Sequence, residues 1–515
     1  MIERLRREST RPRWHDEMGS YTSLTNLLAW AVDLGQGFLQ RSRMLKKLLS
    51  MLFGWRAFPL ASSAAAMGDW LRQHGRWIRR LQWVVILFYG VLLLVPVLLP
   101  LPDETARIFT HLTVFAQFIF WGIGWPLVLL SMLLVGRAWC GILCPEGALS
   151  EWVSGKGRNR PIPRWMRWGG WPVVAFVGTT IYGQMISVYH YPKAVLLILG
   201  SATLAAIVVG YLYAREKRVW CKYLCPVNGV FGLLSKLAPM YFKVDAAAWR
   251  TAYHQAIRIQ PINCAPLVAL RKMEGASDCH MCGRCSGHRD AMTLSTRSPN
   301  HEIVKLGAQL ATGWQSTLLL FGLIGIATGA FQWTVNPHFI EVKQIVAEWL
   351  IDRNILWPFA ENAPGWLLTH YPAQRDVFSW LDGSLLIGYL LGTGLLMGSA
   401  LALILALASR LLGPWQRQRF YHLNQALIPL AGCGVFLGLS ALTVKLLKNE
   451  GIPVFWANDV RFLLLTAATF WSLWLASGIC RHYASSRHRW LFAMAAFCPA
   501  LALIDYSWAL MFWIW

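Results

Sequence analysis

The sequence predicts an all-α polytopic membrane protein of about nine transmembrane helices, with its N-terminus inside and its C-terminus outside. Hydrophobic residues make up 56% of the 515 residues, and the mean hydropathy of +0.41 is too high for a soluble chain of this size. Long apolar stretches recur, and 40 of the 48 Lys and Arg residues fall in segments that this topology places inside. The net charge of +23 is therefore explained by the positive-inside rule, and no nucleic-acid partner or motif is indicated.

Residues 1–80 are predicted to form a basic, amphipathic cytoplasmic region. Its apolar runs at 24–34 and 44–55 are too short to span a bilayer of about 30 Å. They are typical of helices lying on an anionic membrane surface, and an amphipathic cap on a cytoplasmic domain fits equally well. The basic stretch 1–13 is not followed by a cleavage site, so no signal peptide is expected.

The remaining chain divides at changes in hydropathy. Residues 81–214 are predicted to form a four-helix membrane unit, and the polar, basic residues 215–311 a small cytoplasmic domain with a ferredoxin-like site. A fifth transmembrane helix at 312–335 leads to a periplasmic loop at 336–383 and a four-helix unit at 384–515. The nine spans are predicted at about 81–100, 108–135, 170–188, 194–214, 314–335, 384–408, 426–447, 462–479 and 490–515.

Two matching cysteine motifs follow the second and fourth spans. Cys140-x3-Cys144-Pro145 is repeated as Cys221-x3-Cys225-Pro226, so the two helical hairpins look like a duplicated unit with both motifs at one membrane face. Further cysteines follow in the polar domain, and three of them are spaced by two residues, as in bacterial ferredoxins. Eight thiols satisfy two [4Fe-4S] clusters, and the predicted ligands are Cys140, Cys144, Cys221, Cys225, Cys264, Cys279, Cys282 and Cys285.

Zinc and disulfides are the alternative uses of these cysteines. Four-cysteine zinc sites usually combine two C-x2-C pairs, which the x3 spacing and the trailing proline fit poorly. Disulfides are disfavoured because the predicted topology places these cysteines on the reducing side. Cys433, Cys480 and Cys498 lie in or at the ends of the late spans and are expected to act as small apolar residues.

At the cysteine motifs the chain resembles the NapH, NosR and CcoG group of membrane-bound polyferredoxins. The resemblance covers about residues 80–335 and is carried by Gly136-Arg137-Ala138-Trp139-Cys140-Gly141-Ile142-Leu143-Cys144-Pro145 and Trp220-Cys221-Lys222-Tyr223-Leu224-Cys225-Pro226. It implies two cubane clusters and membrane electron transfer, often from a quinol pool toward a periplasmic metalloenzyme or its maturation. No flavin-binding ectodomain of the NosR kind precedes the first span.

The chain departs from a ferredoxin run after Cys285, because the position for a fourth cysteine holds Arg289. By analogy with two-cluster ferredoxins, the triplet would share a cluster with one Cys-Pro cysteine, and Cys264 would join the rest. The basic residues near the triplet would raise the cluster potential and attract an acidic donor, or serve only as topology charges; they are Arg271, Lys272, Arg284 and Arg289.

Clusters on the inside cannot reduce an outside partner directly across about 30 Å, so a carrier within the membrane is expected. A quinone fits this need without any sequence motif. Haem is disfavoured, and His111 and His190 are the only candidate axial ligands on the recognised core. Asp505 lies inside the last span, where it would have a proton or quinone role or form a buried hydrogen bond.

These observations predict an electron-transfer protein of the bacterial inner membrane that links the cytoplasm or the quinol pool to a periplasmic redox protein. Its expected partners are the membrane, a quinone or cytoplasmic electron donor, and that periplasmic protein. One alternative is an accessory factor that changes the redox state of iron or copper for transport or metalloenzyme maturation. Another is a channel or transporter whose clusters serve only as structure or sensor. Whether the chain is itself a quinol dehydrogenase or metal-reducing component is left open.

Overall fold

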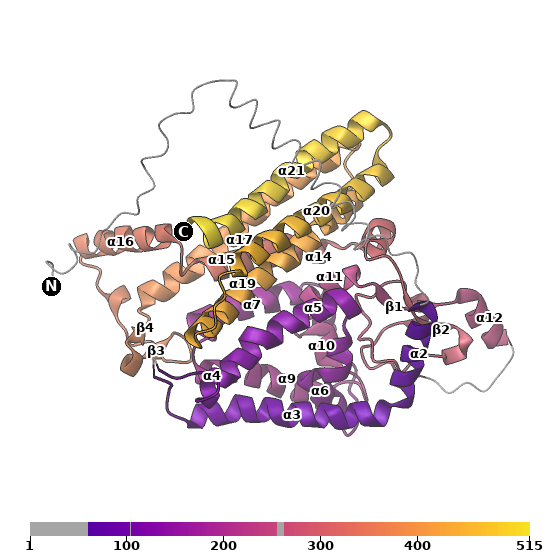
Figure 1. Cartoon of the computed structure of the whole chain (residues 1–515), viewed down its shortest axis with the longest axis horizontal. Helices are drawn as coiled ribbons and strands as arrows, with labels where there is room; N and C mark the ends of the chain where they lie inside the picture. The colour runs from indigo at the N-terminus through magenta and orange to yellow at the C-terminus, as the bar shows by residue number, and fades with distance from the viewer. Residues whose placement is uncertain (1–59, 104, 255–261) are drawn as a thin grey trace. The chain divides into compact units, whose positions relative to one another are not determined.

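The computed structural model describes residues 60–103, 105–254 and 262–515, and Figure 1 shows them in colour. By its internal contacts the chain divides into two units, residues 1–62 and residues 63–515. The described chain is mostly helical, as the sequence predicts. The surface helices expected at 24–34 and 44–55 lie outside the described residues.

Within the described ranges, eight helices are long and apolar enough to cross a membrane. They coincide with eight of the predicted spans, while the third predicted span forms α7 (Trp171–Met185), whose 15 residues are shorter than the roughly 20 that a span needs. A total of nine spans and their orientation therefore stay predictions. The eight helices are α3 (Gly75–Leu98), α4 to α5 (Leu112–Val135), α8 to α9 (Pro192–Leu212), α14 to α15 (Gly313–Gln332), α17 (Trp380–Leu411), α18 to α19 (Arg417–Asn449), α20 (Ala457–Tyr483) and α21 with its final π turn (Arg487–Ile514).

The two hairpins predicted as a duplicated unit share a local irregularity. The second helix of each contains a π-helical segment, at Phe118–Gly124 between α4 (Leu112–Gln117) and α5 (Trp125–Val135), and at Leu196–Gly200 between α8 (Pro192–Val195) and α9 (Ser201–Leu212). Such π segments often occur at functional sites. Helix α5 ends at Gly136, whose φ of +69° suits glycine and turns the chain toward the first cysteine motif.

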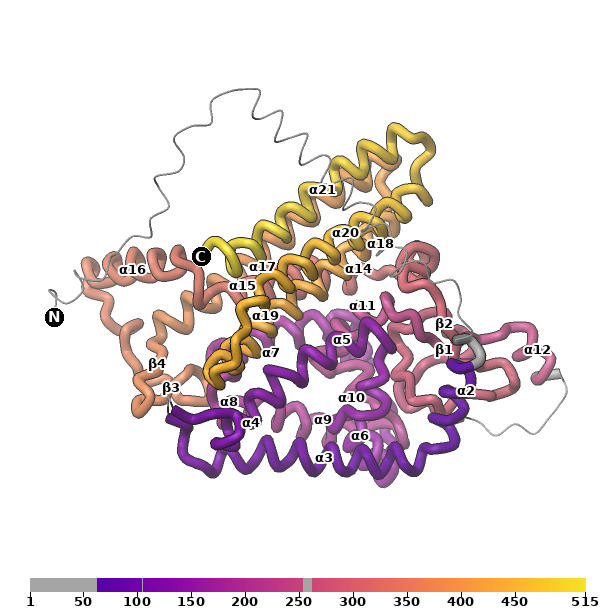
Figure 2. The backbone as a smooth tube through the Cα atoms, viewed as in Figure 1, coloured from indigo at the N-terminus to yellow at the C-terminus, as the bar shows by residue number. Residues whose placement is uncertain are grey.

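Four short helical segments hold the two Cys-Pro motifs. Trp139–Leu143 is a π turn, and it is followed by α6 (Pro145–Ser154). The second motif lies between α10 (Val219–Tyr223) and α11 (Asn228–Leu234). Helix α6 packs along α9, and α10 packs against both, so the second motif folds back onto the first (Figure 2).

The polar domain contains a small antiparallel sheet that brings its ends together. Strand β1 (Met240–Val244) pairs with β2 (Met292–Thr296), with Met240 opposite Thr296 and Val244 opposite Met292. The segment between the strands contains α12 (Ala246–His254) and the four remaining cysteines of the predicted site. The pairing therefore closes this segment into a compact loop.

The region predicted as a loop between the fifth and sixth spans contains regular structure. It forms α16 (Pro337–Asp352), whose N-terminus is capped by the side chain of Asn336. A short hairpin of β3 (His370–Tyr371) and β4 (Asp376–Val377) follows before α17.

The last four spanning helices pack on the helices that carry the cysteine motifs. Helix α17 lies along the π segment Leu318–Ile326 and along α21, and α19 (Ile428–Asn449) lies along α20. At one crossing a Cβ on Gly325 would overlap the backbone of Gly394, so small residues let the helices approach closely. Phe231, Leu320 and Leu405 belong to one buried cluster, which joins both regions in a single core.

Candidate functional site

The two Cys-Pro motifs meet around one cavity. Cys140, Cys144, Cys221 and Cys225 all line a cavity of about 220 Å³ between α3, α5 and the two motif segments. Burial raises the pKa of the Cys144, Cys221 and Cys225 thiols, to about 12 for Cys221, and neighbouring acidic groups of the same site add to the rise. We call these four residues the first quartet.

The other four predicted ligands surround a second, smaller cavity. Cys264, Cys279, Cys282 and Cys285 line a space of about 20 Å³. Burial raises the pKa of Cys264, Cys279 and Cys285, to about 12 for Cys279. The turn between Cys282 and Arg284 needs glycine, because Gly283 has a φ of +75° and a Cβ there would overlap Leu71 of α2 (Leu60–Gln73). We call these residues the second quartet.

The grouping differs from the one that the ferredoxin analogy suggests. The analogy pairs the cysteine triplet with a Cys-Pro cysteine, whereas the described geometry places Cys264 beside the triplet and keeps both Cys-Pro motifs together. The reason is topological. The β1–β2 pairing returns the chain so that Cys264 faces the triplet, and the packing of α10 against α6 brings the duplicated motifs onto each other.

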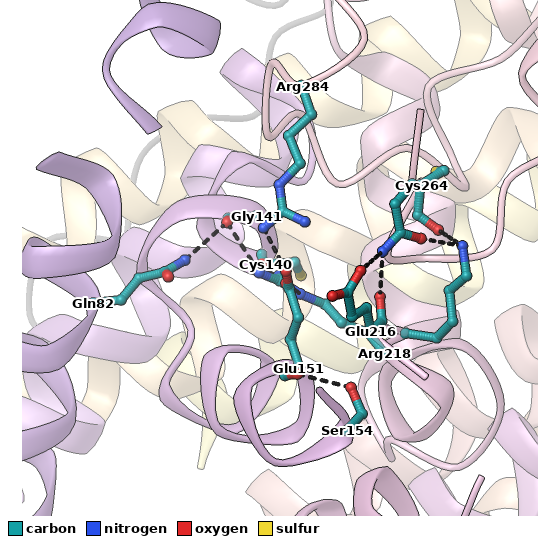
Figure 3. A network of polar contacts seen from close by, with 11 residues as sticks. Gln82, Cys140, Gly141, Glu151, Ser154, Glu216, Arg218, Cys264 and Arg284 are labelled. Atoms are coloured by element: carbon teal, nitrogen blue, oxygen red, sulfur yellow. Dashed lines mark hydrogen bonds and ion pairs between the residues drawn. The ribbon is translucent and has the colours of Figure 1, made fainter. Parts of the chain in front are cut away.

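A buried arginine connects the two quartets (Figure 3). Arg218 donates from Nε to Glu151 over 2.8 Å, from Nη1 to the carbonyl oxygen of Cys140, and from Nη2 to that of Gly141 over 3.4 Å. Glu151 also forms an ion pair with Arg284, which stands between two cysteines of the second quartet. Burial alone would raise the pKa of Glu151, but the charges of Arg218 and Arg284 outweigh it and hold that pKa below its usual value.

The backbones of the two quartets also touch. A Cβ on Gly141 would overlap the carbonyl oxygen of His280 and approach the amide nitrogen of Cys282. Lys217, the residue before Arg218, donates to the carbonyl oxygen of Cys264 over 3.1 Å (Figure 3). The two cavities are therefore neighbours, with polar groups of the chain filling the space between them.

The donor set fits iron–sulfur clusters. No disulfide joins the cysteines, all of which lie in the described part of the chain. Among the described residues no three Cys, His, Asp or Glu side chains converge on a point as a single metal ion requires, whereas the thiolates of a cubane bind four different irons. Buried donors also lack partners here, namely Nε of Arg137 and Nδ1 of His280, and both are suited to donate toward cluster sulfur.

One carboxylate lies within the wall of the first quartet. Glu146 lines the cavity one residue after Pro145 and accepts a hydrogen bond from the indole of Trp220 over 3.1 Å. Burial raises the pKa of Glu146 to about 7, although that hydrogen bond acts in the opposite direction.

The other candidate residues lie away from both quartets in the fold. His111 caps α4, with its Nδ1 accepting from the amide of Thr113 over 3.2 Å. His190 lies in the turn before α8, where its carbonyl oxygen accepts from Gln117 and where burial lowers the pKa of its ring. Asp505 of α21 accepts from the hydroxyl of Thr469 of α20 over 2.8 and 2.9 Å, which is the hydrogen bond that the sequence left as an alternative.

Sequence reasoning missed the arginine that joins the quartets. Its signal was present, because Arg137-Ala138-Trp139-Cys140 and Arg218-Val219-Trp220-Cys221 share the pattern Arg-x-Trp-Cys. Both arginines are buried, at 3% and 1% exposure, and both form hydrogen bonds to carbonyl oxygens of the site. A duplicated arginine at the same offset from duplicated cysteines indicates a role in the site itself.

Comparison with known proteins agrees with this geometry. A 4Fe-4S binding domain family matches residues 117–163 and 196–244, which contain the two Cys-Pro motifs. The chain resembles membrane polyferredoxins in these motifs. It is 28% identical over 234 residues to the putative electron transport protein YccM of Escherichia coli, an alignment that covers 39% of this chain and 63% of that protein.

A second relative of this polyferredoxin-like protein is the methylamine utilization ferredoxin-type protein MauN of Paracoccus denitrificans. The two are 24% identical over 137 residues, which cover 22% of this chain and 48% of MauN. The chain thus spans less than two thirds of the length of each relative. No solved structure matches it. Together the domain and the relatives support an electron-transfer role.

Proposed function

We propose that this polyferredoxin-like protein carries electrons in the bacterial inner membrane through two [4Fe-4S] clusters, one held by each quartet. It would link the cytoplasm or the quinol pool to a periplasmic redox partner. The observation that carries this proposal is that all eight predicted cysteines separate into two sets of four, each around its own cavity. A [4Fe-4S] cluster takes four thiolates and exchanges one electron at a time.

The residues between the quartets support electron exchange between them. Arg218 places one positive charge near both Cys221 and Cys282, where it favours the more negative, reduced state of either cluster. Glu151 offsets part of this charge and fixes the guanidinium, while the contact at Gly141 keeps the two backbones together. These groups form hydrogen bonds within the chain, so they also limit the entry of water between the sites.

A membrane carrier has a suitable place beside the first quartet. An apolar cavity of about 210 Å³ extends from Cys225 and Glu146 to Gln184 and Tyr189 at the far end of α7 and the turn that follows it. It shares lining residues with the cavity of the first quartet, including Trp125 and Phe231. An apolar cavity that reaches from the cysteines along the helices fits a lipophilic quinone better than a polar ion.

The sidedness of the clusters belongs to the same proposal. The positive-inside rule supports a cytoplasmic location for both quartets and for the domain at 215–311, because most Lys and Arg residues accompany them. Labelling probes are attached at position 216, in the proposed cytoplasmic domain, and at position 353, in the proposed periplasmic loop. The accessibility of the two positions in intact cells tests this assignment directly. Labelling of both positions from the same side contradicts it.

The function is tested on protein purified without oxygen. We expect eight iron and eight sulfide per chain by the two-cluster proposal, with electron paramagnetic resonance signals from two reduced clusters. In membrane vesicles, reoxidation of reduced clusters by quinone analogues or a periplasmic protein supports the proposal. Reoxidation only by ferric or cupric ions favours the metal-reducing alternative, and clusters that never turn over favour a structural role.

Filling the apolar cavity tests its role separately. Ala202→Phe on α9 introduces a ring into the cavity lining, and we expect reoxidation by quinone to slow while the iron content stays unchanged. Leu204→Phe on the same helix is the matched control, because Leu204 is 62% exposed on the apolar surface. Equal slowing in both variants would remove the cavity from the electron path.

A further inference from the structure

A further cavity lies beside both quartets and has no role in the function proposed above. Its volume is about 620 Å³, within the roughly 300–1,000 Å³ of small-molecule sites. It shares Arg137 with the cavity of the first quartet, and Val268 and Met273 with that of the second. The shared lining residues make this cavity a neighbour of both quartets.

Cations dominate the walls of this cavity. Arg137, Lys222, Lys236 and Lys272 line it together with two carboxylates. One carboxylate, that of Asp278, is already paired with Lys222 at 2.9 Å. Three cations then face a single remaining acid, Glu274, and the cavity is left with an excess of positive charge.

Two of the cations are deeply buried without a carboxylate partner. Lys236 is 2% exposed, and its ammonium donates to the side-chain oxygen of Gln315 over 2.8 Å. Arg137 is 3% exposed and donates to the carbonyl oxygen of Ser277 and to the side-chain oxygen of Asn228. Within the described residues neither forms an ion pair, and a buried charge without a counter-ion is costly.

The environment of Lys236 favours an anionic ligand. Burial lowers the pKa of Lys236 to about 8, although the negative charges of Glu302 and Asp278 act in the opposite direction. An anion in the cavity would stabilise the charged ammonium further. Lys and Arg are the side chains that bind phosphate groups best.

An aromatic ring at the cavity wall offers a second type of contact. Trp314 lines the cavity, is 44% exposed, and is held edge-on by Trp168 with ring centroids 5.1 Å apart. Its exposed ring can pack against a planar heterocycle. The site thus combines buried cations for a phosphate with an aromatic surface for a flat ring.

We propose that this cavity binds a flavin mononucleotide, a phosphate-bearing redox molecule that exchanges electrons with both quartets. This inference rests on the proposed function. A flavin fits because it gives up two electrons singly, whereas a nicotinamide transfers them together as a hydride. Oxidation of one reduced flavin releases two electrons and two protons, so one electron goes to each of the two clusters and the protons leave to solvent.

Binding is measured on the full-length, cluster-loaded protein in lipid nanodiscs, by quenching of flavin fluorescence without oxygen. Lys236→Met removes the buried ammonium, and we expect the flavin Kd to rise about tenfold or more, as for the loss of a charged hydrogen bond. Lys272→Gln removes an exposed cation of the same cavity and should raise Kd roughly threefold. Inorganic phosphate should compete with the flavin.

Arg271→Gln is the matched control, because Arg271 is the exposed neighbour of Lys272 and does not line the cavity. We expect its Kd to stay within about twofold of the parent value. Equal weakening by Arg271→Gln and Lys272→Gln would reduce the effect to general surface charge and overturn the inference. If Lys236→Met does not fold, the comparison of these two surface variants still decides the question.

A lipid headgroup carries the same phosphate chemistry, so nanodiscs of phosphatidylglycerol and of phosphatidylcholine are compared. Flavin binding in both supports the inference, while its abolition by phosphatidylglycerol, with a phospholipid retained on the protein by mass spectrometry, overturns it. Iron and sulfide are counted in the same samples. Cluster-free protein contradicts the proposed function, whereas cluster-loaded protein that binds no flavin contradicts only this inference.

Discussion

Replacing Arg218 by methionine should disturb both quartets at once. Methionine keeps much of the apolar length of the side chain but removes the charge and every donor. The substitution breaks the pair with Glu151, whose side chain is 18% exposed while that of Arg218 is 2% exposed. It also removes the donor to the carbonyl oxygen of Cys140, although Gly141 keeps a hydrogen bond from Gln82 over 3.2 Å.

The expected magnitudes follow from these contacts. Removing one partner of a buried ion pair destabilises by about 3–5 kcal/mol, and the lower end applies because Glu151 keeps Arg284 as a partner. A unit charge about 10 Å away contributes about 1.7 kcal/mol at an effective dielectric constant of 20. For a one-electron couple this energy corresponds to about 70 mV. Loss of a positive charge disfavours the reduced cluster, so both potentials should fall by tens of millivolts.

The assay is a redox titration followed by electron paramagnetic resonance, with thermal loss of cluster absorbance as the stability readout. Arg215→Met is the control, because Arg215 lies in the same segment but is exposed, and its side chain donates to the carbonyl oxygen of Gly155 rather than to either quartet. Its charge is screened by solvent, so its removal should shift neither potential measurably.

Three results would refute this reasoning about Arg218. Unchanged potentials would show that the charge of Arg218 has no effect on the reduction potential of either cluster. A shift in only one potential would show that it does not serve both quartets. Equal shifts in Arg218→Met and Arg215→Met would reduce the effect to net charge.

Two further predictions concern the packing of the quartets and the assignment of the cysteines. Gly141→Ala forces a Cβ against the carbonyl oxygen of His280, so the two backbones must separate. We expect this variant to lose roughly half or more of its iron. Full iron content would contradict the close contact. Cys225→Ser should remove about half of the iron because it dismantles one cubane, whereas Cys433→Ser on α19 should leave the iron content unchanged. Both are checked by iron and sulfide analysis, and equal losses from Cys225→Ser and Cys433→Ser would overturn the assignment.

Much of the framework could be predicted from the sequence because it rests on patterns along the chain. The eight spanning helices of the described residues were predicted, because each contains an apolar stretch long enough for a bilayer. The repeated Cys-x3-Cys-Pro motif indicated a duplicated hairpin, and both of its second helices, each of which precedes a motif, contain a π segment. Hydropathy could not foresee that α7 would end at Met185, where the turn at Ser187 has a positive φ of 53°.

The grouping of the cysteines could not be predicted, because it depends on contacts between distant segments. Cys264 and Cys279 belong to one quartet through the β1–β2 pairing, and no local pattern in the sequence marks that pairing. The analogy to a ferredoxin run, in which ligands alternate between clusters, led to a different grouping. In the described structure the cysteines of both Cys-Pro motifs line one cavity.

The polar network was missed for a different reason. The Lys and Arg residues of the polar domain were interpreted as topology charges or as a general positive field. Arg218 and Arg137 are instead buried and form defined hydrogen bonds, and Lys236 and Lys272 line a cavity. Composition does not distinguish a Lys or Arg residue that sets membrane topology from one that forms part of a site. The two kinds differ in burial, which only the structure shows.

The central claim is that Cys264 shares a cluster with the triplet and that the Cys-Pro motifs form the other. The double variant Cys264→Ser/Cys282→Ser tests it most directly, because both substitutions fall in one quartet. We expect this variant to keep about half of the iron and one electron paramagnetic resonance signal, while Cys140→Ser/Cys282→Ser loses both clusters. An iron-free Cys264→Ser/Cys282→Ser protein would contradict the account, because its two cysteines would then belong to different clusters.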